Sequence, residues 1–271
     1  MAQRNLLNQL GDNPYDGVAI HYGRARPDYP PAALAILQVA AGDRVVDVGA
    51  GTGIFSRQLA WSYPDARIVG VEPGADMRST AEAAATDVPN LSFVAGSAEA
   101  LPFPDSGLAL VTAATAAHWF DRPRFYAEAF RALRVGGRIA IVQSIRRFWE
   151  SPFLAAYEAL HEDTVPGYRR GTFPAGTGGF AAIDAFGELR RHEATGAVQR
   201  HAFDWDRPMT RETFIPFSLS SSITRRAILA LGETEYLARL NAIIDRHGDA
   251  SGGVEVPYLT TVVMAAKASA A

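Results

Sequence analysis

The sequence DVGAGTG occupies residues 47–53, between a β-branched run at 44–48 and a helical pattern at 54–61. A glycine-rich turn that leaves a strand and opens a helix lets a ligand approach the backbone closely. Glu72 ends the next predicted strand, at 67–72, where its carboxylate can accept hydrogen bonds from the two hydroxyls of a ribose. The turn and the carboxylate together predict a ligand that contains adenosine.

Short β-branched runs alternate with helical patterns between residues 44 and 144, which predicts a parallel sheet with helices on both faces. The helical pattern at 122–133 is expected to be a crossover helix that Gly136 and Gly137 close. We therefore expect an α/β fold with a Rossmann-like, seven-stranded, mostly parallel sheet and an inserted helical cap. The predicted strands are 44–48, 67–72, 91–94, 108–112, 138–142, 198–203 and 256–265.

The pattern changes after residue 144. A helical stretch at 148–163 precedes a stretch rich in Gly, Pro and Thr at 166–179, and we interpret both as part of the cap. The expected parts of the chain are an N-terminal helical entrance or lid segment at 1–40, a ligand-binding core at 41–145, a cap over the substrate pocket at 146–197, and strands and helices at 198–271 that complete the same domain.

Composition excludes several classes of function. The net charge is −3 and the basic residues are scattered, so we expect no nucleic-acid partner. There is no cysteine, which excludes disulfides, thiolate metal sites and cysteine nucleophiles, and no clustered histidines and carboxylates indicate a metal. The first residues lack the apolar core of a signal peptide, and no apolar stretch is long enough to span a membrane. We expect a cytoplasmic protein with no membrane partner.

The run at 47–53 resembles the first motif of the class I S-adenosylmethionine-dependent methyltransferases, an acid followed by G-x-G-x-G. A dinucleotide fingerprint would place its third glycine one residue after Gly53, so the spacing disfavours NAD. Residues 96–103 (GSAEALPF) resemble the family's adenine loop. Residues 22–30 (YGRARPDYP) are similar to the entrance segment of the small-molecule branch that includes trans-aconitate methyltransferase-like enzymes. The resemblance covers most of residues 15–145.

The resemblance implies an enzyme that transfers a methyl group from S-adenosylmethionine to a small organic acceptor and releases S-adenosylhomocysteine. The expected reaction is C- or O-methylation of a hydrophobic or acidic metabolite, as in natural-product biosynthesis and other secondary metabolism. Ser97 departs from the family's pattern, which has an aspartate there, and Ala109 stands where many relatives carry an acid. Two alternatives remain: a non-catalytic S-adenosylmethionine-binding module and a nucleotide-dependent oxidoreductase.

On this resemblance, the cofactor site combines the glycine turn, the end of the second strand, the adenine loop and the entrance segment. Met77 either packs against the adenine edge or fills the core. Tyr22 and Arg26 either meet the methionine carboxylate or are ordinary surface residues. The expected cofactor-binding residues are Tyr22, Arg26, Gly49, Ala50, Gly51, Gly53, Glu72, Pro73, Met77, Ser97, Ala98, Glu99 and Thr115.

His118 follows the fourth predicted strand, at the carboxyl edge where open α/β sheets place their ligands. This position makes it a candidate general base, with Tyr22 as a second catalytic candidate; the alternative is a histidine packed under Trp119. Arg146 follows the fifth strand, where its guanidinium can hold a carboxylate or diphosphate of the substrate. The expected substrate-binding residues are His118, Trp119, Arg146, Phe148, Trp149 and Tyr168.

The N-terminal segment at 1–16 carries Leu6, Leu7 and Leu10 at near-helical spacing. It is a candidate either to cover the pocket or to exchange with a neighbouring subunit in a homo-oligomer. The expected partner is otherwise a small-molecule substrate.

Overall fold

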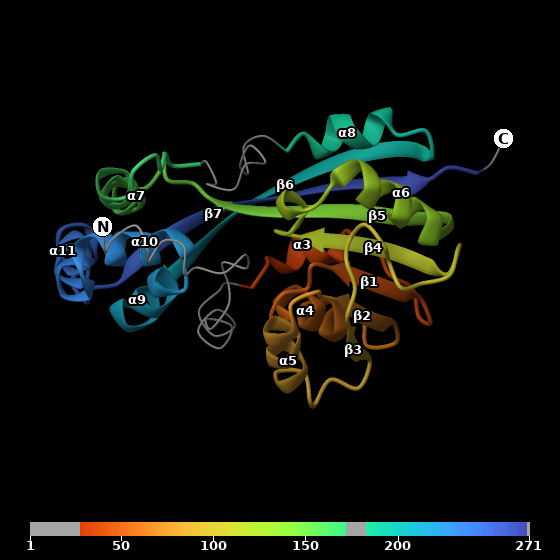
Figure 1. Cartoon of the computed structure of the whole chain (residues 1–271), viewed down its shortest axis with the longest axis horizontal. Helices are drawn as coiled ribbons and strands as arrows, with labels where there is room; N and C mark the ends of the chain where they lie inside the picture. Colours follow the sequence, from red (N-terminus) through yellow and green to blue (C-terminus); the bar gives the residue numbers. More distant parts are fainter. Residues whose placement is uncertain (1–27, 172–182, 270–271) are drawn as a thin grey trace, which may run out of the picture.

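The computed structural model describes residues 28–171 and 183–269. Its seven strands are β1 (Arg44–Val48), β2 (Arg67–Val71), β3 (Leu91–Val94), β4 (Leu108–Ala114), β5 (Leu133–Arg146), β6 (Thr195–Met209) and β7 (Val254–Lys267). They form one sheet in the order β3-β2-β1-β4-β5-β7-β6 (Figure 1). Neighbours among β1 to β5 are parallel, whereas β7 is antiparallel to both β5 and β6. The predicted seven-stranded, mostly parallel α/β sheet is therefore confirmed.

Helices cover both faces of this sheet. The helices are α3 (Pro31–Ala35), α4 (Ile54–Ser62), α5 (Ala75–Ala83), α6 (Arg122–Ala132), α7 (Pro152–Thr164), α8 (Ala185–Arg191), α9 (Arg211–Leu219), α10 (Ser222–Leu231) and α11 (Glu233–His247), with a short 3₁₀ turn, η1 (Ala117–Trp119). Successive residues of a strand point to opposite faces, and Val45 and Val46 of β1 accordingly lie in two different cores. Val46 shares its core with side chains of α6 and α8, and Val45 shares its core with α3 and α4.

A third core holds four of the remaining helices together. Side chains of α7, α9, α10 and α11 pack with one another and with the ends of β6 and β7 nearest to them. These four helices, called the four-helix cap below, lie together at one end of the long strands, away from α4 and α5 (Figure 1). The boundary expected at residue 197 cuts through this group, because α7 lies before it and the other three helices lie after it.

The connection from α6 to β5 differs from the expectation. Gly136 and Gly137 were expected to close a helix, and this is wrong, since α6 ends at Ala132 and β5 begins at Leu133. Gly136 has φ 73° at an irregularity in the pairing of β4 with β5. A Cβ on Gly137 would lie 2.9 Å from the carbonyl oxygen of Leu108. The two glycines therefore shape a bulge that lets the strands stay close.

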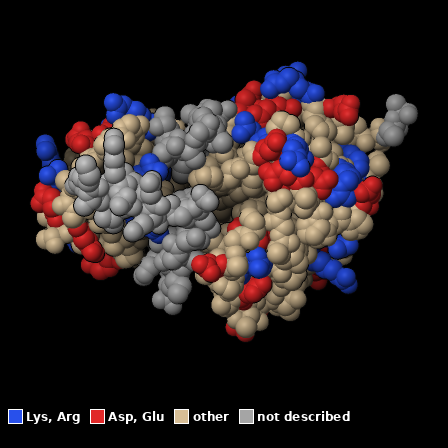
Figure 2. Space-filling model, in the orientation of Figure 1, with Lys and Arg blue, Asp and Glu red and all other residues tan. Residues whose placement is uncertain are grey.

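Residues 28–171 and 183–269 lack two kinds of feature. No helix there is both long enough and apolar enough to cross a bilayer. The same residues contain no group of three His, Asp or Glu side chains arranged to hold a metal ion. On the face shown in Figure 2, acidic and basic side chains are interspersed.

Candidate functional site

The glycine turn joins β1 to α4 at the carboxyl edge of the sheet. Gly49, Gly51 and Gly53 all have positive φ, at 71°, 56° and 76°. A Cβ on Gly49 would lie 2.7 Å from the Cβ of Ala116, whereas a Cβ on Gly51 would meet nothing within 4 Å. Close packing therefore requires glycine at residue 49, while Gly51 leaves open space in front of the turn.

Asp47 lies at the start of this turn and is 1% exposed. Its Oδ2 accepts a hydrogen bond from Ser56 Oγ at 2.6 Å, and its Oδ1 accepts one from Thr112 Oγ1 at 3.1 Å. Burial raises the pKa of Asp47 to about 7, against the lowering effect of these two hydrogen bonds. The turn therefore begins at a buried acid that ionises near neutral pH.

Glu72 follows β2 and reaches back to the turn. Its Oε2 accepts a hydrogen bond from the backbone nitrogen of Gly51, and its Oε1 accepts one from Gly74, both at 2.8 Å. Because a carboxylate can accept about four hydrogen bonds, lone pairs remain for the hydroxyls of a ribose. Glu72 thus fixes the shape of the turn and remains chemically able to bind a sugar.

A cavity of about 440 Å³ extends from the glycine turn to the four-helix cap. This volume lies in the range of small-molecule sites, which is about 300–1,000 Å³. The ends of β1 and β4 supply one end of the cavity, with Asp47, Gly49, Ala50, Gly51, Thr52, Thr115 and His118. The other end contains Arg146, Phe148, Trp149, Tyr157, Glu158, Tyr168, Phe217 and Tyr258.

The predicted cofactor residues fall into three groups. Gly49, Ala50, Gly51 and Thr115 line the cavity. Tyr22 and Arg26 lie outside the described residues, as does the segment 1–16. The others do not belong to the cavity lining, although they lie on the neighbouring turns after β1, β2 and β3 or on α5: Gly53, Glu72, Pro73, Met77, Ser97, Ala98 and Glu99.

Two of these residues are buried, and a third links two elements through a hydrogen bond. Met77 on α5 is 5% exposed, and Ala98 is 4% exposed. The Glu99 carboxylate accepts a hydrogen bond from the backbone nitrogen of Asp121 at 2.9 Å, which links the loop after β3 to the start of α6. Contacts of these residues with adenine stay predictions.

His118 lies in η1 and is 4% exposed, with its ring centroid 4.9 Å from that of Trp119. Burial lowers the pKa of His118 to about 4, so its imidazole is neutral at physiological pH. Trp119 is 38% exposed and does not line the cavity. The site therefore presents a neutral and weakly basic histidine beside the glycine turn.

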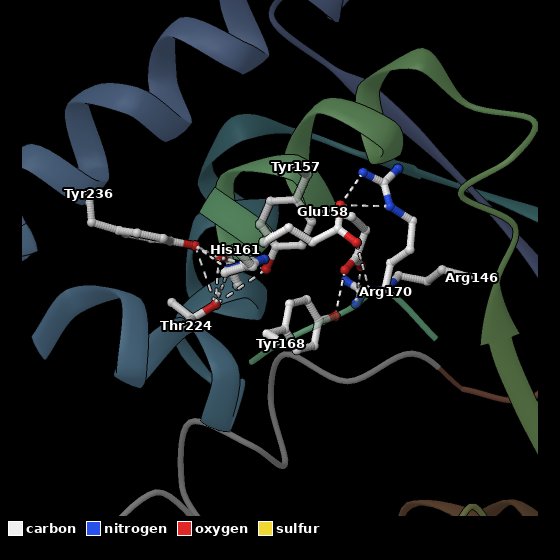
Figure 3. Close-up of polar contacts among 10 residues, drawn as sticks. Arg146, Tyr157, Glu158, His161, Tyr168, Arg170, Thr224 and Tyr236 are labelled. Carbon is white, nitrogen blue, oxygen red and sulfur yellow. Dashed lines mark hydrogen bonds and ion pairs between the residues drawn. The ribbon is translucent and has the colours of Figure 1, made fainter. Parts of the chain in front are cut away.

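The other predicted substrate residues, Arg146, Phe148, Trp149 and Tyr168, all line the cavity. Arg146 Nη2 donates to Glu158 Oε1 at 2.8 Å, and the Tyr168 hydroxyl donates to Glu158 Oε2 at 2.6 Å (Figure 3). This end of the cavity therefore combines aromatic rings with one buried ion pair.

Several residues of the cavity were not predicted as site residues from the sequence. Tyr29 donates from its hydroxyl to Thr115 Oγ1 at 2.8 Å, and its place in the entrance segment was a usable signal. Gln143 lies on β5, beyond the pairing of Ala114 with Val142. Its Nε2 is buried and makes no hydrogen bond within the described part of the chain. No local sequence pattern distinguishes Gln143 or Glu158 from ordinary strand and helix residues.

Comparison with known proteins agrees with this geometry. A family model described as a methyltransferase domain matches residues 46–141. The uncharacterized methyltransferase Rv3342 of Mycobacterium tuberculosis is 32% identical over 248 residues, which cover 90% of this chain and 91% of the relative.

Two solved structures share the fold. The YcgJ protein from Bacillus subtilis has a TM-score of 0.52 and 20% identity, and the match covers 89% of this chain and 100% of that one. Phosphoethanolamine N-methyltransferase 2 of Haemonchus contortus, in complex with S-adenosyl-L-methionine, has a TM-score of 0.53 and 16% identity, covering 99% of this chain and 60% of that one.

Proposed function

This chain belongs to the methyltransferase family, and we propose that it transfers the methyl group of S-adenosylmethionine to a small organic acceptor and releases S-adenosylhomocysteine. The observation that carries the proposal is one continuous cavity, which begins at the glycine turn and ends among the aromatic side chains of the cap. We assign the accepting atom to carbon or oxygen of a hydrophobic or acidic metabolite, as in the small-molecule branch that the entrance segment resembles.

The residues around the glycine turn fit a ligand that contains adenosine. Gly51 leaves open space beside the cavity, and the Glu72 carboxylate adjoins the same turn. When bound, S-adenosylmethionine supplies a methyl group already activated by its positive sulfur. The tasks left to the protein are to orient the acceptor and to exclude water.

The state of His118 bears on the class of acceptor. A neutral imidazole whose pKa is about 4 removes a proton poorly from a phenol, whose pKa is about 10. We propose that His118 contacts the acceptor as a neutral hydrogen-bonding group. This favours an acceptor atom that is ionised or acidic before methyl transfer.

Transfer of labelled methyl groups tests the proposal. The purified protein is incubated with methyl-labelled S-adenosylmethionine and a panel of carboxylic acids, phenols and β-dicarbonyl compounds, with protein and nucleic acid as comparison acceptors. We expect label in the small-molecule fraction. Transfer to macromolecules alone would contradict the proposal, and binding without transfer to any acceptor would support the non-catalytic module instead.

A further inference from the structure

The cap end of the cavity contains an ion pair between the sheet and the cap. Arg146 lies at the end of β5, and Glu158 lies on α7 and is 3% exposed. Both oxygens of Glu158 are engaged, because Oε1 accepts from Arg146 and Oε2 accepts from the Tyr168 hydroxyl (Figure 3). Glu158 therefore holds Arg146 and Tyr168 in place at the cap end of the cavity.

The guanidinium of Arg146 has hydrogen-bond donors that Glu158 does not use. A guanidinium has five N–H donors, and within residues 28–171 and 183–269 the side chain of Arg146 donates one hydrogen bond, to Glu158. The side chain is 23% exposed and lines the cavity, so its remaining donors are accessible from there. An unfilled donor set on a cavity wall can recognise an oxygen of a ligand.

The position of this guanidinium is fixed. Its central carbon lies 5.4 Å from the ring centroid of Tyr157 and 5.8 Å from that of Phe217. Together with the hydrogen bond to Glu158, these two rings hold the donors before a ligand arrives. A guanidinium fixed in this way loses little side-chain entropy on binding, which favours planar recognition of a carboxylate.

We propose that Arg146 anchors a carboxylate of the methyl acceptor at the cap end of the cavity, with Glu158 and Tyr157 as positioning residues. This inference rests on the proposed function. The aromatic side chains of Phe148 and Tyr168 line the same end and suit an apolar body next to the carboxylate. An ammonium group has no lone pair to accept a hydrogen bond from the remaining donors of Arg146, so a cationic amine cannot use this anchor.

The strand geometry indicates that this carboxylate is not the group that receives the methyl. Val142 accepts a hydrogen bond from the backbone nitrogen of Thr115 at 2.8 Å, so this part of β5 adjoins the turn side of the cavity. Arg146 lies three residues beyond Gln143, which corresponds to about 10 Å along a strand. Because the guanidinium also contacts Glu158, Tyr157 and Phe217, the acceptor has its carboxylate at the cap end and its reacting carbon or oxygen toward the cofactor end.

Calorimetry with three probes of equal shape tests the anchor. The probes are 3-(4-hydroxyphenyl)propanoate, the corresponding propanol and the corresponding propylamine, titrated into the protein with and without S-adenosylhomocysteine. We expect the carboxylate to bind about tenfold more tightly than the alcohol, and the amine to bind most weakly. Equal or undetectable binding of all three probes would overturn the proposal.

The matching variant removes both charges of the pair. Arg146→Met alone would leave the buried Glu158 without its partner, so the double variant Arg146→Met/Glu158→Gln is used. It should lose the preference for the carboxylate and keep the wild-type affinity for S-adenosylhomocysteine, which also reports folding. Arg225→Met removes an arginine of α10 that does not line the cavity and should keep the preference.

A double variant that still prefers the carboxylate would also contradict the anchor. If the wild-type protein prefers the carboxylate but does not bind S-adenosylhomocysteine, the proposed function fails while the anchor stands.

Discussion

Burial controls the charge of two side chains beside the cavity. Asp47 is 1% exposed and His118 is 4% exposed, and in both cases loss of water is the first cause of the pKa shift. The pKa of Asp47 is raised and the pKa of His118 is lowered, and both shifts have the same cause, because burial favours the uncharged form of an acid and of a base. The pH dependence of stability therefore tests the assignment for Asp47, and the pH dependence of turnover tests the assignment for His118.

Asp47→Asn should change how stability depends on pH. The pKa of Asp47 is about 7 in the folded protein, above the ordinary value of 3.8, so its contribution to stability is present below pH 4 and is lost as the pH rises through 7. Asparagine does not ionise and should remove that loss. We expect the variant to gain on the order of 2 kcal/mol relative to wild type between pH 5 and pH 8, measured by thermal unfolding. Parallel pH curves for the two proteins would contradict this.

His118→Ala should have a moderate effect on turnover. A lost hydrogen bond corresponds to about a tenfold decrease in kcat/KM, whereas loss of a general base typically costs about 10²–10⁴-fold. Because the pKa of His118 is about 4, its protonation should leave no inflection in kcat/KM between pH 6 and pH 9. The measurement is the pH profile of kcat/KM for both proteins. A decrease of a thousandfold, with loss of an inflection near pH 6.5, would show that His118 is a base.

Within the glycine turn, Gly49 is expected to matter mainly for packing and Gly51 mainly for ligand binding. Gly49→Ala places a Cβ 2.7 Å from Ala116 and should destabilise the protein by about 2–3 kcal/mol. Gly51→Ala meets nothing within 4 Å in the protein and should cost only about 1 kcal/mol. It should nevertheless reduce the affinity for S-adenosylhomocysteine about tenfold or more, because Gly51 lines the cavity where we propose that the cofactor binds. Thermal unfolding and calorimetry on the pair check this, and equal effects of the two variants on binding and stability would contradict it.

The elements that the sequence predicts well are those with local signals. The glycine turn, β1 and the start of α4 follow from one run of residues and lie where expected. The extra length of β6 was missed, because its residues are mostly exposed or half-buried and carry no apolar run. Gly136 and Gly137 resemble a helix stop, and only their pairing with β4 reveals a bulge.

The cap and its part of the site depend on contacts between distant residues. Tyr157 of α7 packs edge-to-face on Phe214 of α9, and its hydroxyl bonds to Ser218 at 2.9 Å. These partners are separated by more than fifty residues, so no local pattern assigns α7 and α9 to one group. The same reasoning explains why Glu158 was not predicted at the cavity.

For the whole molecule, the arrangement of the cores explains where the cavity lies. The parallel strands bring the turns after β1 and β4 to one edge of the sheet, which is where open α/β sheets bind ligands. The long strands β6 and β7 continue past that edge into the four-helix cap, and β5 pairs with β7 as far as Arg146. The cavity therefore has one end formed by the turns and another formed by the cap, which suits one ligand at each end.

Calorimetry with S-adenosylmethionine, S-adenosylhomocysteine and NAD tests the central claim most directly. The wild-type protein should bind the first two and not NAD. Glu72→Ala should weaken both by about tenfold or more, since it removes the acceptor that we propose for the ribose hydroxyls and the hydrogen bond that Glu72 accepts from Gly51. Glu82→Ala, which removes an exposed acid of α5, is the matched control and should bind like wild type. Selective binding of NAD, or affinity for S-adenosylmethionine that is unchanged in Glu72→Ala, would contradict the account.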